Sequence, residues 1–129
     1  MTDYSRAEEA RIEKVEGYAF DTIPAREHRP VIEWRYPEFQ SLCPVSERHD
    51  QGELVLRYKP AEHILESKSM REYLSAWRNK LIWQEYVTDV MAGDVFNAIK
   101  PEWLTLEIRW TPRGGIFATT RAVRGNIKD

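Results

Sequence analysis

The most reactive side chain in this sequence is its single cysteine, Cys43, and Asp50 follows it seven residues later. A thiolate can attack an electrophilic carbon, and a carboxylic acid nearby can supply a proton to the atom that becomes negative. Both residues fall between two predicted strands, where the chain can fold the carboxyl group back towards the sulfur. Arg48 and His49 are candidates to keep the thiol ionised. The alternative is that Cys43 is a small buried hydrophobe, as isolated cysteines often are.

Three other polar segments could bind a ligand: Glu-Ser-Lys-Ser at 66–69, Glu85, and Thr-Pro-Arg-Gly-Gly at 111–115. Each also has a purely structural interpretation. Ser69 and Glu72 have the spacing of a capping box at a helix start. Glu85 would begin a second helix, where acidic residues are favoured. The segment 111–115 has the composition of a hairpin turn.

Alternation of apolar and polar residues predicts the strands that would position these groups. The predicted strands cover residues 31–36, 53–58, 104–110 and 115–123. Proline is expected to end the first two, at Pro37 and Pro60. This leaves residues 37–52 as a long connection that carries Cys43, and long ordered loops are often functional.

Two helices are predicted between the second and third strands. The first has apolar residues at helical spacing, namely Met70, Tyr73, Leu74, Trp77 and Leu81. The second runs from Trp83 to Ala98 and stops before Pro101. The order ββααββ predicts an α+β domain, with an antiparallel four-stranded sheet and two helices on one face. Because an open sheet exposes two edges, we expect homo-oligomerisation through them.

The chain has 129 residues, which suits one domain at 31–129 preceded by an N-terminal arm at 1–30. Within the arm, 5–16 could form a short polar helix, while 17–30 is expected to be extended and to pack on the domain or a neighbouring subunit. The 19 basic and 21 acidic residues nearly balance, so direct nucleic-acid binding is not expected. With no long apolar segment or secretory signal, we expect a cytoplasmic protein without membrane contact. One cysteine excludes an intrachain disulfide, and no metal site is expected.

Together these motifs resemble the QueF-type nitrile reductases of queuosine biosynthesis, in their smaller, single-module form. The resemblance runs from about Val31 to Ala122. It is carried by Glu-Phe-Gln-Ser-Leu-Cys-Pro at 38–44, Asp50, Glu-Ser-Lys-Ser at 66–69, Trp-Arg-Asn at 77–79, Glu85, and Thr-Pro-Arg-Gly-Gly at 111–115. It implies a tunnel fold, whose subunits join edge to edge into rings or stacked rings with active sites at subunit interfaces.

The resemblance also implies the chemistry, which is NADPH-dependent reduction of the nitrile of 7-cyano-7-deazaguanine to 7-aminomethyl-7-deazaguanine for tRNA modification. Cys43 would attack the nitrile carbon to form a thioimide, and Asp50 would protonate the nitrogen. The implied substrate-binding residues are Leu65, Glu66, Ser67, Gln84 and Glu85. The implied cofactor-binding residues are Lys68, Ser69 and Arg113.

The sequence departs from the family pattern at a few positions. Gln84 stands where histidine is usual, so a titratable group is missing next to Glu85. Arg71 and Glu72 replace a lysine and an apolar residue, and the stretch 50–52 lacks the usual aromatic continuation. Two alternatives remain open. One is a QueF-like amidine-forming enzyme that adds ammonia to the same nitrile without NADPH, and the other is a non-catalytic deazapurine-binding module.

Overall fold

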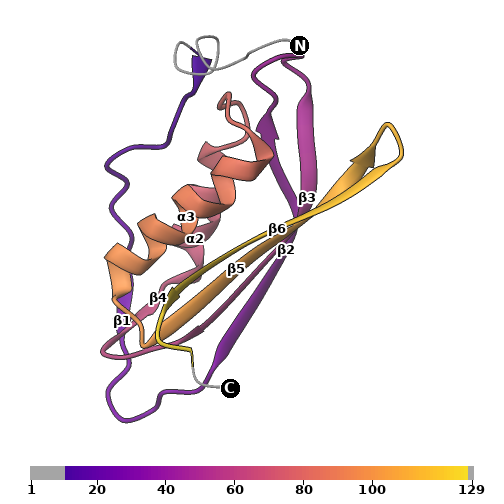
Figure 1. The fold of residues 1–129 in the computed structure, drawn as a ribbon. Coiled ribbons are helices and arrows are strands. Elements are labelled where there is room, and N and C mark those ends of the chain that lie inside the picture. The colour runs from indigo at the N-terminus through magenta and orange to yellow at the C-terminus, as the bar shows by residue number, and fades with distance from the viewer. Residues whose placement is uncertain (1–10, 128–129) are drawn as a thin grey trace.

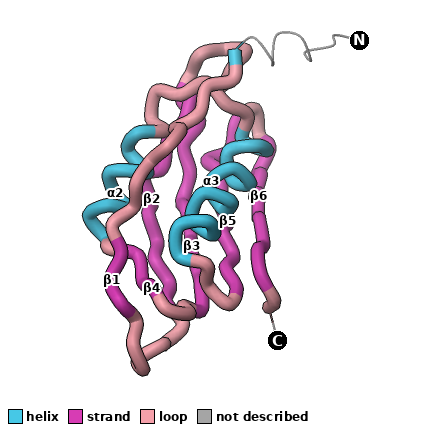
Figure 2. The backbone as a smooth tube through the Cα atoms, turned by 90° about the vertical axis from the view of Figure 1, so that its left-hand side faces the viewer, coloured by secondary structure: helices cyan, strands magenta, loops and turns pink. Residues whose placement is uncertain are grey.

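A computed structural model describes residues 11–127 of the chain, and its architecture is the predicted α+β one. Four antiparallel strands form one sheet in the order β2-β3-β5-β6, and the two helices cover one of its faces (Figure 1, Figure 2). The strands are β2 (Ile32–Leu42), β3 (His49–Lys59), β5 (Trp103–Arg113) and β6 (Ile116–Gly125). Strands β2 and β6 are the exposed edges, and Figure 1 shows the β5–β6 hairpin projecting past the rest of the sheet.

The helices are α2 (Ser67–Ala76) and α3 (Gln84–Ile99). Their apolar faces and the facing side of the sheet form one buried core, with Tyr58, Tyr73 and Trp77 fully enclosed. Helix α3 ends before Pro101 as predicted, at Lys100 in the left-handed conformation. No helix in the described part of the chain is both long and apolar enough to cross a bilayer.

Helix α2 differs from the prediction at both ends. It ends at Ala76 rather than continuing to Leu81, which instead bridges Leu42 at the end of β2. Its N-cap is Glu66, whose carboxylate oxygens accept hydrogen bonds from the backbone N–H groups of Lys68 (2.8 Å) and Ser69 (2.7 Å). The predicted capping box of Ser69 with Glu72 was therefore wrong, because Glu66 caps the helix three residues earlier and already accepts from the Ser69 N–H that Glu72 would have satisfied.

The prediction that Pro37 ends the first strand was also wrong. Strand β2 continues through Pro37 to Leu42, with a register shift between Tyr36 and Phe39. Proline is tolerated there because β2 is an edge strand and the ladder is irregular at that point. The connection between β2 and β3 is consequently only residues 43–48, far shorter than the predicted loop at 37–52.

The N-terminal arm lies along the outer side of the helices, between α2 and α3 (Figure 2). Its strand β1 (Thr22–Pro24) pairs with β4 (His63–Leu65) in a small second sheet that was not predicted. The Tyr18 phenol donates to the Ser69 carbonyl (2.7 Å), and the Asp21 N–H donates to the Ser69 hydroxyl (2.9 Å). Of the predicted helix at 5–16, residues 12–16 are not helical, and 5–10 lie outside the described residues.

Candidate active site

Cys43 begins the tight turn that joins β2 to β3. Its N–H donates to the Arg48 carbonyl (2.9 Å), and its own carbonyl accepts from the Glu47 N–H (2.9 Å). Glu47 adopts a left-handed conformation with φ of 58°, which closes the turn. These contacts fix the backbone at Cys43 and leave its half-buried side chain at the end of the sheet.

The turn favours ionisation of the Cys43 thiol. Burial acts to raise the pKa of Cys43, but hydrogen bonds from the Ser46 hydroxyl and from the backbone N–H groups of Ser46 and Val45 outweigh it, so the pKa lies below its ordinary value. The negative charge of Asp50 acts in the opposite direction. A lowered pKa increases the thiolate fraction at neutral pH, as a nucleophile requires.

Neither side chain predicted to keep the thiol ionised is among the groups that lower its pKa. The ring of His49 pairs with Asn79, and the contact that Arg48 makes with Cys43 comes from its backbone. Ser46 was missed by the sequence analysis. Its position three residues after the cysteine, in a Cys-Pro-Val-Ser turn, is the signal that could have identified it.

Asp50 lies on β3 and is almost completely buried, with its side chain 5% exposed. The Arg113 guanidinium donates a 2.6 Å hydrogen bond to its carboxylate. This hydrogen bond and the negative charge of Asp50 raise the pKa of Arg113, and contact with Cys43 adds a smaller contribution. The guanidinium of Arg113, at the end of β5 next to the hairpin turn, thus meets both residues predicted to be catalytic.

One pocket of about 420 Å³ is lined by half of the predicted site residues. That volume is within the range of small-molecule sites. Its walls include the predicted residues Cys43, Asp50, Gln84, Glu85 and Arg113. Trp83 and Trp110 also line it and were not predicted to do so. The Trp110 indole N–H donates to the Thr120 hydroxyl (3.0 Å), which is itself hydrogen-bonded to Thr88 (2.6 Å), so this aromatic wall is held in one orientation.

The remaining predicted residues, at 65–69, lie at the other end of the sheet. Leu65 is buried, and its N–H donates to the Tyr58 phenol (3.1 Å). Tyr58 and Asp50 are eight residues apart on β3, which corresponds to about 26 Å at the rise of a β-strand. Glu66 and Ser67 follow Leu65 directly, so they do not share a pocket with Cys43 inside one chain.

The three predicted cofactor residues are also separated. Ser69 is buried, with its hydroxyl and carbonyl both hydrogen-bonded to the arm, and Arg113 is paired with Asp50. Lys68 is exposed, and it lines a surface pocket together with Arg71, Glu72 and Ser75. The two cations are suited to a phosphate group, whereas the Glu72 carboxylate is not, and the Ser75 hydroxyl donates to the Arg71 carbonyl (2.9 Å). Ser69 and Arg113 are already engaged elsewhere.

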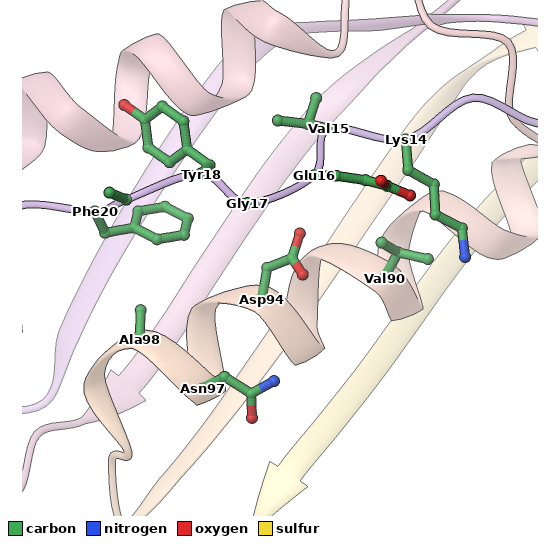
Figure 3. A pocket seen from close by; sticks show the side chains of 11 residues that line it. Lys14, Val15, Glu16, Gly17, Tyr18, Phe20, Val90, Asp94, Asn97 and Ala98 are labelled. Atoms are coloured by element: carbon green, nitrogen blue, oxygen red, sulfur yellow. The ribbon is translucent and has the colours of Figure 1, made fainter.

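A further pocket, of about 590 Å³, lies between the N-terminal arm and α3 (Figure 3). Its polar lining includes Lys14, Glu16, Asp94 and Asn97. None of the predicted site residues contributes to it. The thiol, the buried carboxylate and the two tryptophans line the smaller pocket, which is therefore the candidate active site.

Comparison with known proteins shows the family to which the chain belongs. Residues 49–128 match the family described as QueF-like protein. The "NADPH-dependent 7-cyano-7-deazaguanine reductase" of Rhodopirellula baltica is 39% identical over 72% of this chain and 77% of its own length. The protein of the same name from Nitrobacter hamburgensis is 36% identical over 84% of this chain and 65% of its own length.

The fold has a counterpart among solved structures. The crystal structure of the archaeosine synthase QueF-Like in the apo form superposes with a TM-score of 0.70, over 76% of this chain and 96% of that one. The sequence identity is 18%, so this likeness concerns the fold alone. The family match covers most of the sheet, α2, α3 and Asp50, and the relatives match at more than a third of the aligned positions. The chain belongs to the QueF-like family.

Proposed function

We propose that this protein reduces the nitrile of 7-cyano-7-deazaguanine to the aminomethyl group, using NADPH, as a step of queuosine biosynthesis. The observation that carries the proposal is the convergence of Cys43, Asp50 and Glu85 on one pocket. The protein is an oxidoreductase, in keeping with the reductase name that its relatives share. Reduction of a nitrile to an amine takes two hydrides, and NADPH supplies them when bound.

The covalent step begins at Cys43. Its thiolate attacks the nitrile carbon, a carbon–sulfur bond forms, and one π bond of the nitrile breaks to leave a thioimide. Asp50 supplies the proton that the nitrile nitrogen requires. Its burial excludes water from that transfer and keeps the carboxyl group next to the sulfur.

The pocket supplies two means of holding the base. Trp83 and Trp110 offer aromatic surfaces to a planar ring system. Glu85, in the first turn of α3, offers a carboxylate that can accept hydrogen bonds from a ring N–H and an exocyclic amine. Gln84 can hydrogen-bond the base but cannot exchange a proton with it at neutral pH.

The second base-binding carboxylate, Glu66, would come from another subunit. The distance of about 26 Å between the two ends of β3 excludes an intrachain arrangement, and the resemblance implies sites between subunits. Two open sheet edges support edge-to-edge assembly. Ile116 (71% exposed) and Phe117 (85% exposed) at the hairpin offer apolar surface next to one of these edges. Leu65 and Ser67 flank Glu66 and would enter the same shared site.

NADPH would be held chiefly by Lys68 and Arg71, whose side chains flank one surface pocket on α2. Both cations suit the additional phosphate that distinguishes NADPH from NADH. Because Glu66 caps the start of α2, a subunit that contributes Glu66 to a neighbour's site brings these cations with it. Ser69 would act indirectly, by fastening the start of α2 to the arm.

Addition of ammonia to the same nitrile, without NADPH, is the second candidate. The engagement of Ser69 and Arg113 elsewhere favours it, since two of three predicted cofactor contacts are otherwise occupied. Both reactions pass through the Cys43 adduct, which then reacts with NADPH in the reductase and with ammonia in the amidine-forming enzyme. The reductase should oxidise two NADPH for each nitrile, whereas the amidine-forming enzyme should require ammonia and ignore NADPH.

Intact-mass measurement tests the proposal directly. The protein is mixed with 7-cyano-7-deazaguanine, and its mass is recorded before and after NADPH is added. We expect an adduct with the mass of the base that disappears with NADPH as the aminomethyl base accumulates. Cys43→Ala should form no adduct. An adduct that persists with NADPH and is lost with ammonia would identify the amidine-forming enzyme, and base that binds without an adduct would identify a binding module.

A further inference from the structure

We propose that Arg113 is a positioning residue for the covalent step: its hydrogen bond holds the buried carboxyl group of Asp50 beside Cys43, from where Asp50 delivers a proton to the nitrile nitrogen. The proposal rests on the proposed function, and it gives Arg113 a different role from the cofactor contact implied by the sequence.

The two side chains of the Arg113–Asp50 ion pair differ in their exposure to solvent. The guanidinium is 41% exposed, whereas the carboxylate is 5% exposed. A buried carboxylate requires a compensating charge, and Arg113 provides the only ion pair with Asp50 in the described part of the chain. The cross-strand partner of Asp50 is Ser41, which is fully buried and whose hydroxyl has no hydrogen-bond partner among the described residues. Arg113 therefore carries this compensation.

A β-bulge turns Arg113 towards Asp50. Side chains alternate along a strand, so in a regular β5 Arg113 would share the outer face with Arg109, away from the core. The register between β5 and β6 shifts between Trp110 and Arg113, where β5 has one more residue than β6. One extra residue reverses the alternation and re-aims the side chains that follow. The shift thus brings Arg113 to the side of the sheet on which Asp50 is buried.

A close approach of β3 to β5 completes the geometry. A Cβ atom at Gly52 would lie 2.7 Å from the Arg109 carbonyl oxygen and 2.9 Å from Cγ2 of Ile108. No side chain is tolerated there without movement of the backbone, so glycine permits this spacing two residues after Asp50. The glycine and the bulge are on neighbouring strands, and their joint effect is a short contact between Asp50 and Arg113.

Thioimide formation balances in atoms and protons with Cys43, Asp50 and the nitrile alone. Cys43 and Asp50 together carry one proton, and this proton lies on Asp50 when the sulfur attacks the nitrile carbon as a thiolate. The carbon–sulfur bond forms while one carbon–nitrogen π bond breaks, and the nitrogen takes the same proton from Asp50. The thioimide therefore contains every atom of the thiol and the nitrile, and no reductant is consumed before NADPH acts.

The test measures adduct formation in the absence of NADPH. Arg113→Gln is compared with wild type and with Arg109→Gln, a matched control on the same strand whose ion pairs to Glu53 and Glu107 lie on the outer face. We expect Arg113→Gln to slow adduct formation about 10- to 100-fold, since acid–base assistance typically contributes that much or more. Arg109→Gln should match wild type, and Arg113→Lys should recover part of the rate because it retains the charge.

Two further measurements separate positioning from a general structural effect. In an Asp50→Asn background, Arg113→Gln should add little to the loss, because residues that act as a unit are not additive. The KM for NADPH in residual turnover should stay within about twofold of wild type. Circular dichroism and thermal melting establish that each variant is folded.

The proposal is overturned if Arg113→Gln forms the adduct at the wild-type rate while its KM for NADPH rises, because Arg113 would then be a cofactor contact. It is also overturned if Arg113→Gln slows adduct formation by the same factor in the Asp50→Asn background as in wild type. Failure of wild type itself to form an adduct is a separate result, and that result contradicts the proposed function rather than the role of Arg113.

Discussion

The Tyr73 phenol donates a 2.6 Å hydrogen bond to the Asp94 carboxylate, and this contact joins α2 to α3. Asp94 faces the arm from α3 (Figure 3). The rings of Tyr18 and Phe20 pack on Tyr73 from the arm, with centroids 5.3 and 4.6 Å away. Burial raises the pKa of Tyr73 well above its ordinary value, and Asp94 adds to the effect, so the phenol stays a donor.

Tyr73→Phe should therefore lower the free energy of unfolding. The variant keeps the ring packing and removes a hydrogen bond to a charged group, which is typically worth about 1.5–3 kcal/mol. Urea denaturation with a shared m-value measures the change. Tyr18→Phe is the matched control, because its lost partner is the neutral Ser69 carbonyl, and it should cost about 1 kcal/mol. Equal losses in the two variants would contradict the special role of the Tyr73–Asp94 pair.

The capping role of Glu66 predicts a pH dependence of stability. Hydrogen bonds from the N–H groups of Lys68 and Ser69 hold the pKa of Glu66 below its ordinary value of 4.5. The stabilisation is therefore present above that ordinary value and is lost as pH falls through the folded-state pKa. Between about pH 5 and pH 3, Glu66→Gln should lose less stability than wild type. Urea midpoints at the two pH values measure this, and Glu72→Gln, an exposed glutamate on the same helix, is the matched control.

The lowered pKa of Cys43 predicts rapid alkylation at neutral pH. Ser46→Ala removes the hydroxyl that donates to the sulfur, so the pKa should rise and the thiolate fraction at pH 7 should fall. We expect iodoacetamide to react about 3- to 10-fold more slowly at that pH, with the midpoint of the rate profile moved upward. Ser75→Ala, on α2, is the control. An unchanged profile in Ser46→Ala would assign thiolate stabilisation to the backbone N–H groups instead.

Local sequence patterns were sufficient for the two helices and four strands of the main domain, and for the proximity of Cys43 to Asp50, but not for the small β1–β4 sheet. Cys43 and Asp50 flank the β2–β3 turn, and residues at the two sides of a short connection are necessarily close. Their proximity followed from spacing even though the connection was predicted to be much longer. Pro37 caused that error, because whether a proline ends a strand depends on whether the strand is at a sheet edge.

The partners contributed by distant elements could not be predicted in the same way. The contact of Arg113 with Asp50 depends on one extra residue in β5, which reverses the side-chain alternation without any change in composition. The start of α2 was misplaced because Ser69 and Glu72 match a capping pattern as well as Glu66 does. Tertiary contacts decide between the two, since Ser69 is engaged by Asp21 from the arm.

The tight spacing at Gly52 yields the last prediction, which separates local strain from loss of chemistry. Gly52→Ala should force β3 away from the Arg109 carbonyl, which a Cβ would approach to 2.7 Å, at a cost of about 1–3 kcal/mol. Asp50 should move with the strand, so adduct formation should slow. Gly93→Ala, in α3 where a Cβ meets nothing within 4 Å, should instead stabilise by up to about 1 kcal/mol. The melting temperature and the rate of adduct formation are measured for both variants. Wild-type values for Gly52→Ala would mean that neither stability nor adduct formation requires the close approach of β3 to β5.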